Sequence, residues 1–391
     1  MVVMQVVSSF AVRALPVIGP EITAAAGVAP QDIGILAGAV SAGTMWFLLS
    51  GSLTITYWGP VRILQIGAVI GAAGALAGIP ASWWLLVIAA FLIGLGYGPS
   101  PPAASDILTR TSPRNHLSLI MSVKQAGVPL GGALAGVLLP AVTVMAGWRA
   151  ALLVTAILLL ASAAVVQPWR NQLDVDRDTS QLPTPGNIFS RANLAVPFLL
   201  FKEIPGMAPL TTAVFCFASV QACVLAFFVT QITTELGFSL TIAGAAFSAM
   251  QVSGTIFRII MGWIADRIGS SRALLLLACA SMGMVLVFAH MGSQWSPWMI
   301  MATGFCLGMT SISWNGVYLA EVARIAPQGR IGDATSGSTF FAFIAYTLAP
   351  FLFTLGVSAT QSYGQCFIVV ALIQAVAIPC LIHSIRKARK Y

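Results

Sequence analysis

Three cationic side chains stand inside long apolar stretches of this 391-residue chain: Arg13, Lys124 and Arg258. A charge at the centre of a bilayer costs at least ~2.5–3.5 kcal/mol, so each cation needs a partner, water or a function. At ~1.5 Å per residue, Arg258 lies about 12 Å from Asp266, Arg13 about 12 Å from Glu21, and Lys124 about 10 Å inside its stretch. In a hydrocarbon core about 30 Å thick, all three fall within roughly 5 Å of the midplane.

The acidic residues do not lie at the depth of these three cations. All eleven lie in loops or near the expected helix ends: Glu21, Asp32, Asp106, Asp174, Asp176, Asp178, Glu203, Glu235, Asp266, Glu321 and Asp333. A pocket with up to three such cations should therefore attract an anion, which would supply the counter-charge. Structural alternatives stay open: Lys124 could snorkel to the cytoplasm, Arg13 could bind helix-end carbonyls, and Arg258 could have a purely structural role.

The elements that must position these cations are membrane spans. The chain is 58% hydrophobic and 8% charged, with mean hydropathy +0.92, which excludes a soluble domain. We predict an all-α membrane protein, since a spanning helix needs roughly 20 apolar residues. Twelve stretches satisfy this length: 2–20, 31–57, 62–80, 83–108, 117–144, 148–169, 207–235, 240–265, 271–292, 296–322, 331–358 and 362–385.

Orientation follows from Lys and Arg. With the N-terminus inside, fifteen of the nineteen fall at the cytoplasmic side and only Arg149 falls outside. This asymmetry predicts that both termini are cytoplasmic. The membrane is expected to be an inner (plasma) membrane of bacterial type. No basic region precedes the first apolar run, which argues against a cleaved signal peptide, and residues upstream of Met1 could be missing.

The chain is expected to form two six-helix bundles, 1–169 and 206–391. The polar interval 170–205 reads as a cytoplasmic linker in which Asp174, Asp176 and Asp178 are solvated. A calcium loop is disfavoured because the required glycine and distal glutamate are missing.

The two bundles resemble an internal repeat. Gly59 corresponds to Gly269 at an offset of about 210, and Gly94 corresponds to Gly308 at an offset of 214.

The most specific motif is RIIMGWIADRIGSSR, Arg258 to Arg272. It resembles the loop between the second and third helices of each half of a major facilitator superfamily transporter, with six matching residues: Gly262, Ala265, Asp266, Arg267, Gly269 and Arg272. This resemblance implies twelve helices, alternating access and a substrate near the midplane between the halves. It also implies that Asp266 closes the cytoplasmic side by pairing with basic groups or a helix N-terminus, and that Gly262 and Gly269 allow close helix approach. In the N-terminal copy, Thr56 replaces the acid.

Arg258 adds a second resemblance. An arginine four residues before the motif glycine is similar to the substrate arginine of oxalate/formate exchangers, monocarboxylate transporters and nitrate/nitrite porters. This implies bidentate binding of a carboxylate by Arg258. Monocarboxylate transporters couple a proton through an aspartate four residues before this arginine. The present sequence has Gly254 at that position. In the oxalate exchanger a lysine completes the pair with this arginine; segment 331–358 here has no lysine, but Lys124 lies in the repeat counterpart of that segment.

Segment 124–136, KQAGVPLGGALAG, is loosely similar to a signature of drug/proton antiporters, with Val128 inserted between Gly127 and Pro129. Six further residues could contact substrate or serve in ordinary helix packing: Gln125, Trp46, Trp314, Asn315, Gln221 and Tyr346.

No catalytic constellation, phosphate loop or metal-ligand spacing is found, so we expect no enzyme activity and no cofactor. The six cysteines read as small core residues.

The sequence therefore predicts a monomeric secondary transporter of a small organic anion, most simply a carboxylate. The expected partners are this substrate, a coupling proton or counter-anion, and the lipid bilayer, without nucleic acid. The alternatives are efflux of a drug or lipophilic cation, and a membrane sensor or scaffold that does not transport.

Overall fold

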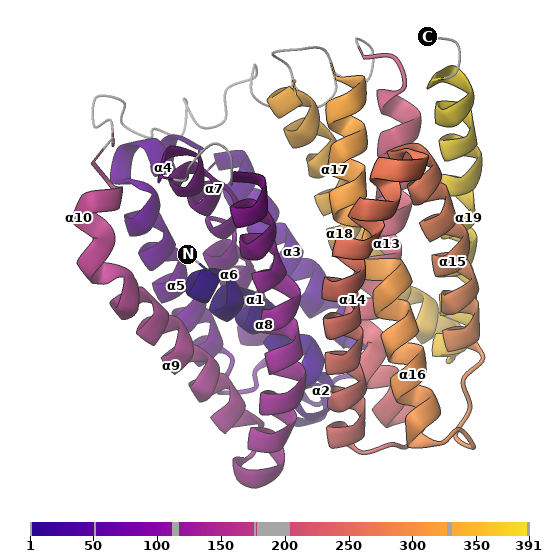
Figure 1. Cartoon of the computed structure of the whole chain (residues 1–391). Helices are drawn as coiled ribbons and strands as arrows, with labels where there is room; N and C mark the ends of the chain where they lie inside the picture. The colour runs from indigo at the N-terminus through magenta and orange to yellow at the C-terminus, as the bar shows by residue number, and fades with distance from the viewer. Residues whose placement is uncertain are drawn as a thin grey trace. The chain divides into compact units, whose positions relative to one another are not determined.

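A computed structural model describes residues 2–50, 52–111, 117–175, 177, 204–326 and 331–388 (Figure 1). These residues form helices joined by short turns and contain no strand. The chain divides into two compact units, Met1–Asn193 and Leu194–Tyr391. Each of the twelve predicted apolar stretches contains helix, which confirms the all-α membrane fold.

The N-terminal unit begins with a bent pair of helices. Pro16 lies inside α1 and Pro20 lies in the first turn of α2, and the two helices meet at 55°. Proline is tolerated in a first helical turn, which is why the helix resumes beyond the predicted end at residue 20. The helices of this unit are α1 Val2–Val17, α2 Gly19–Ala26, η1 Pro30–Asp32, α3 Ile33–Ser50, α4 Ser52–Trp58, α5 Pro60–Ala77, α6 Trp83–Tyr97, α7 Ser100–Thr111, α8 Leu117–Ala146, α9 Trp148–Val166, η2 Gln167–Trp169 and α10 Arg170–Leu173.

The C-terminal unit packs around a core that includes Phe217, Trp314 and Leu274. Two of its spans contain π-helical turns, η3 and η4, which sequence periodicity did not predict. Its helices are α13 Met207–Thr230, η3 Gln231–Glu235, α14 Leu240–Ile268, α15 Ser270–Ala289, α16 Pro297–Leu307, η4 Gly308–Ile312, α17 Trp314–Ile325, α18 Ile331–Thr360 and α19 Tyr363–Ala388.

Nine helices in the described part of the chain are long and apolar enough to cross a membrane, and the bent pair α1–α2 makes a tenth. Of the remaining predicted stretches, 31–57 contains α3 and α4, which flank residue 51 outside the described part of the chain, and 296–322 contains a helix interrupted by a π-helical turn, α16–η4–α17.

The internal repeat appears as the same helix crossing in both units. In the N-terminal unit α3 crosses α6 so closely that a methyl group at Gly94 would overlap the Val40 carbonyl oxygen. Thr44 Oγ1 donates a 3.0 Å hydrogen bond to the Gly94 carbonyl across this crossing.

In the C-terminal unit α14 crosses η4 in the same way. A methyl group at Gly308 would overlap the Met250 carbonyl oxygen, and Ser253 Oγ donates a 2.6 Å hydrogen bond to the Phe305 carbonyl. Gly94 and Gly308 differ by 214 residues, and Val40 and Met250 by 210, so the crossing recurs at the offsets found in the sequence.

We expect Gly94→Ala to lower the free energy of unfolding by about 2 kcal/mol, because the added methyl group must push the α3 backbone away. Thermal unfolding of the purified protein measures this loss. The control is Gly283→Ala, whose added methyl group meets no atom within 4 Å. Equal melting temperatures for the two variants would contradict the tight crossing.

Candidate functional site

Arg258 lies on α14, half-buried, and its guanidinium reaches the π-helical turn η4. Nη2 donates a 3.2 Å hydrogen bond to the Ile312 carbonyl oxygen, at the last residue of that turn. A π-helical turn interrupts the regular hydrogen-bond ladder, so carbonyl oxygens at its end can accept from side chains. The broken helix between α16 and α17 thus fixes the position of the arginine.

The other four predicted residues of the C-terminal unit join this position. Gln221 Oε1, on α13, accepts hydrogen bonds from Trp314 Nε1 at 2.9 Å and Tyr346 Oη at 2.8 Å. Asn315 Nδ2 lies 3.4 Å from the same oxygen and 3.5 Å from the Ile312 carbonyl oxygen that Arg258 contacts. The structure therefore brings all five residues into one polar cluster, from α13, α14, α17 and α18.

The buried and the half-buried side chains of this cluster have different roles. Gln221 and Trp314 are buried, and the ring of Phe217 stacks on Trp314 with centroids 5.6 Å apart. Arg258, Asn315 and Tyr346 are half-buried. The buried pair holds the accessible side chains in place, and those side chains present hydrogen-bond donors. Such a donor-rich edge with a guanidinium suits an anionic oxygen.

Lys124 lies on α8 in the N-terminal unit and is 2% exposed, so it does not snorkel to solvent as the structural alternative required. Its Nζ donates a 3.3 Å hydrogen bond to the Pro101 carbonyl oxygen, in the first turn of α7. The helix of this span is interrupted here, because α6 ends at Tyr97 and α7 begins at Ser100. Neither ion pair seen among the described residues includes Lys124.

A second polar cluster, missed by the sequence analysis, lies near Lys124. Gln5 on α1 is buried, and its Oε1 accepts a 3.2 Å hydrogen bond from Ser100 Oγ. Its Nε2 donates to Ser9 Oγ at 3.3 Å and to Tyr97 Oη at 3.4 Å. The repeat could have revealed it: Ser100 lies 214 residues before Trp314, and each donates to a glutamine, Gln5 on α1 or Gln221 on α13.

Three further predicted residues lie in the N-terminal unit. Gln125 is exposed although Lys124 beside it is buried, because successive residues of a helix face different directions. Trp46 on α3 is exposed over half its surface, and Arg13 on α1 is half-buried.

The motif at the end of α14 depends on one backbone conformation. Gly269 ends the helix with φ +91°, which a glycine adopts without strain. Asp266 and Arg267 are exposed, with the Arg267 guanidinium 3.6 Å from the centroid of Trp263. Arg272 Nη1 donates a 3.2 Å hydrogen bond to the Ile268 carbonyl.

The predicted reason for two motif glycines is wrong. A methyl group at Gly262 or Gly269 would meet no atom of a described residue within 4 Å, so neither glycine serves close approach between the described helices. For Gly269 the requirement is the positive φ. Closure of the cytoplasmic side by Asp266 stays a prediction.

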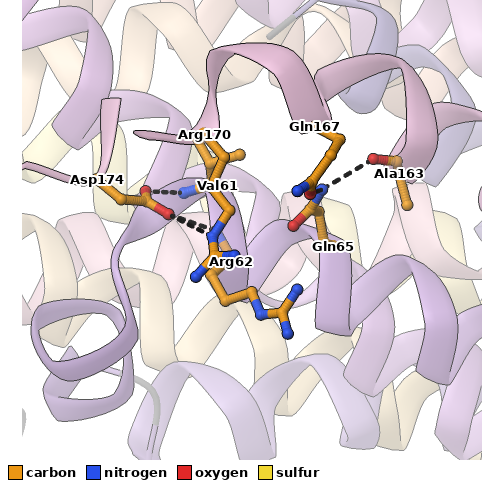
Figure 2. Close-up of polar contacts among 7 residues, drawn as sticks. All are labelled: Val61, Arg62, Gln65, Ala163, Gln167, Arg170 and Asp174. Atoms are coloured by element: carbon orange, nitrogen blue, oxygen red, sulfur yellow. Dashed lines mark hydrogen bonds and ion pairs between the residues drawn. The ribbon is translucent and has the colours of Figure 1, made fainter. Parts of the chain in front are cut away.

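Asp174 is not a solvated linker residue, as the sequence analysis expected. It is 6% exposed and accepts hydrogen bonds from the backbone N–H of Val61 at 2.7 Å and of Arg62 at 3.1 Å (Figure 2). Arg170 Nε lies 3.7 Å from Asp174 Oδ2, the oxygen that also accepts from Arg62. The helix runs on past residue 169 through α10 and places this carboxylate at the N-terminus of α5, where the helix dipole favours a negative charge. Asp176 and Asp178 lie outside the described residues.

The C-terminal unit anchors the equivalent helix, α15, with Glu321. This buried carboxylate accepts a 2.5 Å hydrogen bond from Ser271 Oγ, in the first turn of α15. Arg324 donates to the same carboxylate through Nε at 2.9 Å and Nη2 at 2.5 Å. No group of metal-ligating side chains occurs in the portion of the chain that the structure covers.

Comparison with known proteins places these features in a family. The family model described as Major Facilitator Superfamily matches residues 1–350. A protein named "Probable sulfoacetate transporter SauU" from Cupriavidus necator is 26% identical over 141 residues, 36% of this chain. An "Uncharacterized MFS-type transporter MT3072" from Mycobacterium tuberculosis is 22% identical over 317 residues, 78% of this chain. The matches span 33% and 66% of the lengths of these two relatives.

Solved structures share the fold at low identity. The nucleoside transporter NupG, solved as a mutant, superposes with TM-score 0.79 at 12% identity and 98% coverage of both chains. The peptide transporter POT in complex with sulfate gives TM-score 0.78 at 16% identity, with 100% of this chain and 93% of that chain covered. A bacterial homologue of the human lysosomal transporter Spinster, inward-facing and unoccupied, gives 0.77 at 13% identity, with 98% and 95% covered. With its helical units, its motif and the family model over most of its length, the chain is an integral membrane protein and belongs to the Major Facilitator Superfamily of secondary transporters.

Proposed function

We propose that this transporter moves a small organic anion, a carboxylate in the simplest case, by alternating access. The observation that carries the proposal is the cluster around Arg258. A guanidinium and the donors of Asn315 and Tyr346 form its accessible edge, and buried Gln221 and Trp314 hold that edge in place. A carboxylate accepts two parallel hydrogen bonds from a guanidinium, which gives both charge complementarity and orientation.

Three donors of this cluster share one acceptor, Gln221 Oε1. A carbonyl oxygen has two lone pairs, and the 3.4 Å contact from Asn315 is the longest of the three. Asn315 Nδ2 can therefore turn to an anionic oxygen at small cost, because it gives up only a weak bond. In this proposal Lys124 and Arg13 add positive charge in the N-terminal unit.

One relative supports the chemical class. The Cupriavidus necator protein is named as a probable sulfoacetate transporter, and sulfoacetate carries a carboxylate and a sulfonate. Efflux of a lipophilic cation, the alternative within transport, is disfavoured because Arg258 would repel a positive charge at the accessible edge of the cluster.

Counterflow in proteoliposomes tests the proposal. Vesicles that contain the wild-type protein are loaded with one compound, and entry of the same labelled compound is followed for acetate, lactate, oxalate, sulfoacetate, nitrate and tetraphenylphosphonium. We expect saturable counterflow for at least one carboxylate or sulfonate and none for tetraphenylphosphonium, relative to protein-free vesicles. Counterflow of the cation without any anion would contradict the proposal.

A further inference from the structure

A groove of about 400 Å³ runs along the N-terminal unit between α5 and α9. Arg62, Gln65 and Gln167 line one end of it, and Ile66, Val69 and Ile70 line its length. Both helices belong to the stretches that can cross a membrane. The polar end lies at the start of α5 and the end of α9, the side that the Lys and Arg distribution predicts to be cytoplasmic (Figure 2).

The polar end contains a buried acceptor without a partner. Gln65 is 7% exposed, and its Nε2 donates to the Ala163 carbonyl at 3.0 Å and to Gln167 Oε1 at 2.7 Å. These two acceptors fix the orientation of the amide, since a flipped amide would turn its oxygen toward them. Gln65 Oε1 is then left with no hydrogen bond to any described residue. Such a buried oxygen favours a ligand that brings an N–H or O–H donor.

The same end carries a positive charge, Arg62, that has no acidic partner among the described residues. The backbone N–H groups at the start of α5 are already bound by Asp174, so they do not attract a second anion. The charge of Asp174 is balanced by Arg170, at 3.7 Å. Arg62 is exposed and takes part in neither ion pair found among the described residues. Its guanidinium therefore offers a bidentate site for a phosphate.

The remainder of the groove is apolar and open. Val69 is 52% exposed, and it lies seven residues beyond Arg62, about 10 Å deeper along α5. Exposed apolar side chains on a membrane-spanning helix contact hydrocarbon, so an acyl chain fits this part of the groove.

We propose that the groove binds a phospholipid with a glycerol headgroup, of the phosphatidylglycerol type. Arg62 binds the phosphate, a headgroup hydroxyl donates to Gln65 Oε1, and an acyl chain lies over Ile66 and Val69. Arg62 and Gln65 are one helical turn apart, so an ammonium donor at Gln65 would lie beside the guanidinium and be repelled. A choline headgroup has no donor for this oxygen.

Native mass spectrometry of the full-length protein, titrated with phosphatidylglycerol, phosphatidylethanolamine or phosphatidylcholine, tests the site. We expect phosphatidylglycerol to bind at least about tenfold tighter than either other lipid, since its headgroup hydroxyl satisfies the buried Gln65 Oε1 and such a hydrogen bond is worth about this factor. Arg62→Gln should weaken the binding of phosphatidylglycerol about tenfold. In Gln65→Leu the affinity for phosphatidylglycerol should fall close to the affinity for phosphatidylcholine. Equal binding of the three lipids by the wild-type protein would overturn the proposal.

Two further variants separate this site from general charge and from misfolding. Arg272→Gln is the matched control, because Arg272 occupies the repeat position of Arg62, at the start of α15, and should leave the affinity unchanged. Val69→Trp fills the groove at an exposed position that folding tolerates, and it should weaken binding as Arg62→Gln does. Equal losses in Arg62→Gln and Arg272→Gln, or no loss in Val69→Trp, would contradict a defined site. Glycerol 3-phosphate should not compete at millimolar concentration, and competition would show a site for a soluble headgroup instead.

Discussion

Replacement of Arg258 by alanine is expected to reduce uptake of the anionic substrate at least about 100-fold, which corresponds to about 2.7 kcal/mol of lost transition-state stabilisation. The guanidinium is the charged member of the cluster in the C-terminal unit, and Ile312, at the end of η4, holds it in place. Arg258→Lys should also lose about tenfold or more, because an ammonium keeps the charge but cannot make two parallel hydrogen bonds. Initial rates of uptake into proteoliposomes, at equal amounts of reconstituted protein, measure both losses.

The control for this prediction is Arg149→Ala. Arg149 is exposed at the start of α9, where it lies over the ring of Trp148 and binds the Ile79 carbonyl. Its loss should change uptake by less than about twofold, as for other exposed charges. Thermal unfolding of Arg258→Ala shows whether the variant is folded. Wild-type uptake by a folded Arg258→Ala would refute the anion site.

Replacement of Asp174 by alanine is expected to lower the free energy of unfolding by about 2 kcal/mol. Its buried carboxylate accepts two backbone hydrogen bonds at the N-terminus of α5, and losing a capping carboxylate costs up to about this much. The Asp174 side chain also packs closely against Gly59, whose φ is +88°. A methyl group added at Gly59 would come within 2.5 Å of it. Thermal unfolding of the purified protein, followed by intrinsic fluorescence, measures the change.

Two companion variants identify the cause of that loss. Asp174→Asn keeps one acceptor oxygen but loses the charge, so its stability should lie between the wild type and Asp174→Ala. Arg170→Gln removes the partly exposed ion pair at 3.7 Å and should change stability by less than about 0.5 kcal/mol. A melting temperature of Asp174→Ala equal to that of wild type would show that α5 needs no cap.

Features that depend on local sequence were predictable. The twelve apolar stretches indicated helices because a backbone in hydrocarbon must satisfy its own hydrogen bonds. The loop that begins at Gly269 was expected from the motif around it, although the reason expected for the glycine was wrong. Polar residues in apolar stretches stood out as candidates, and five of them form the cluster around Arg258.

What the sequence by itself determined was the family, the helical class and the residue types that could bind an anion. Only the tertiary structure decided which of them meet. Gln5 and Ser100 are 95 residues apart, and Asp174 and Val61 are 113 apart, yet each pair is joined by a hydrogen bond. For this reason Asp174, expected from the sequence to be a linker residue, is a helix cap in the structure. Contacts between distant residues depend on which helix faces pack together, and no local pattern of residue types encodes that choice.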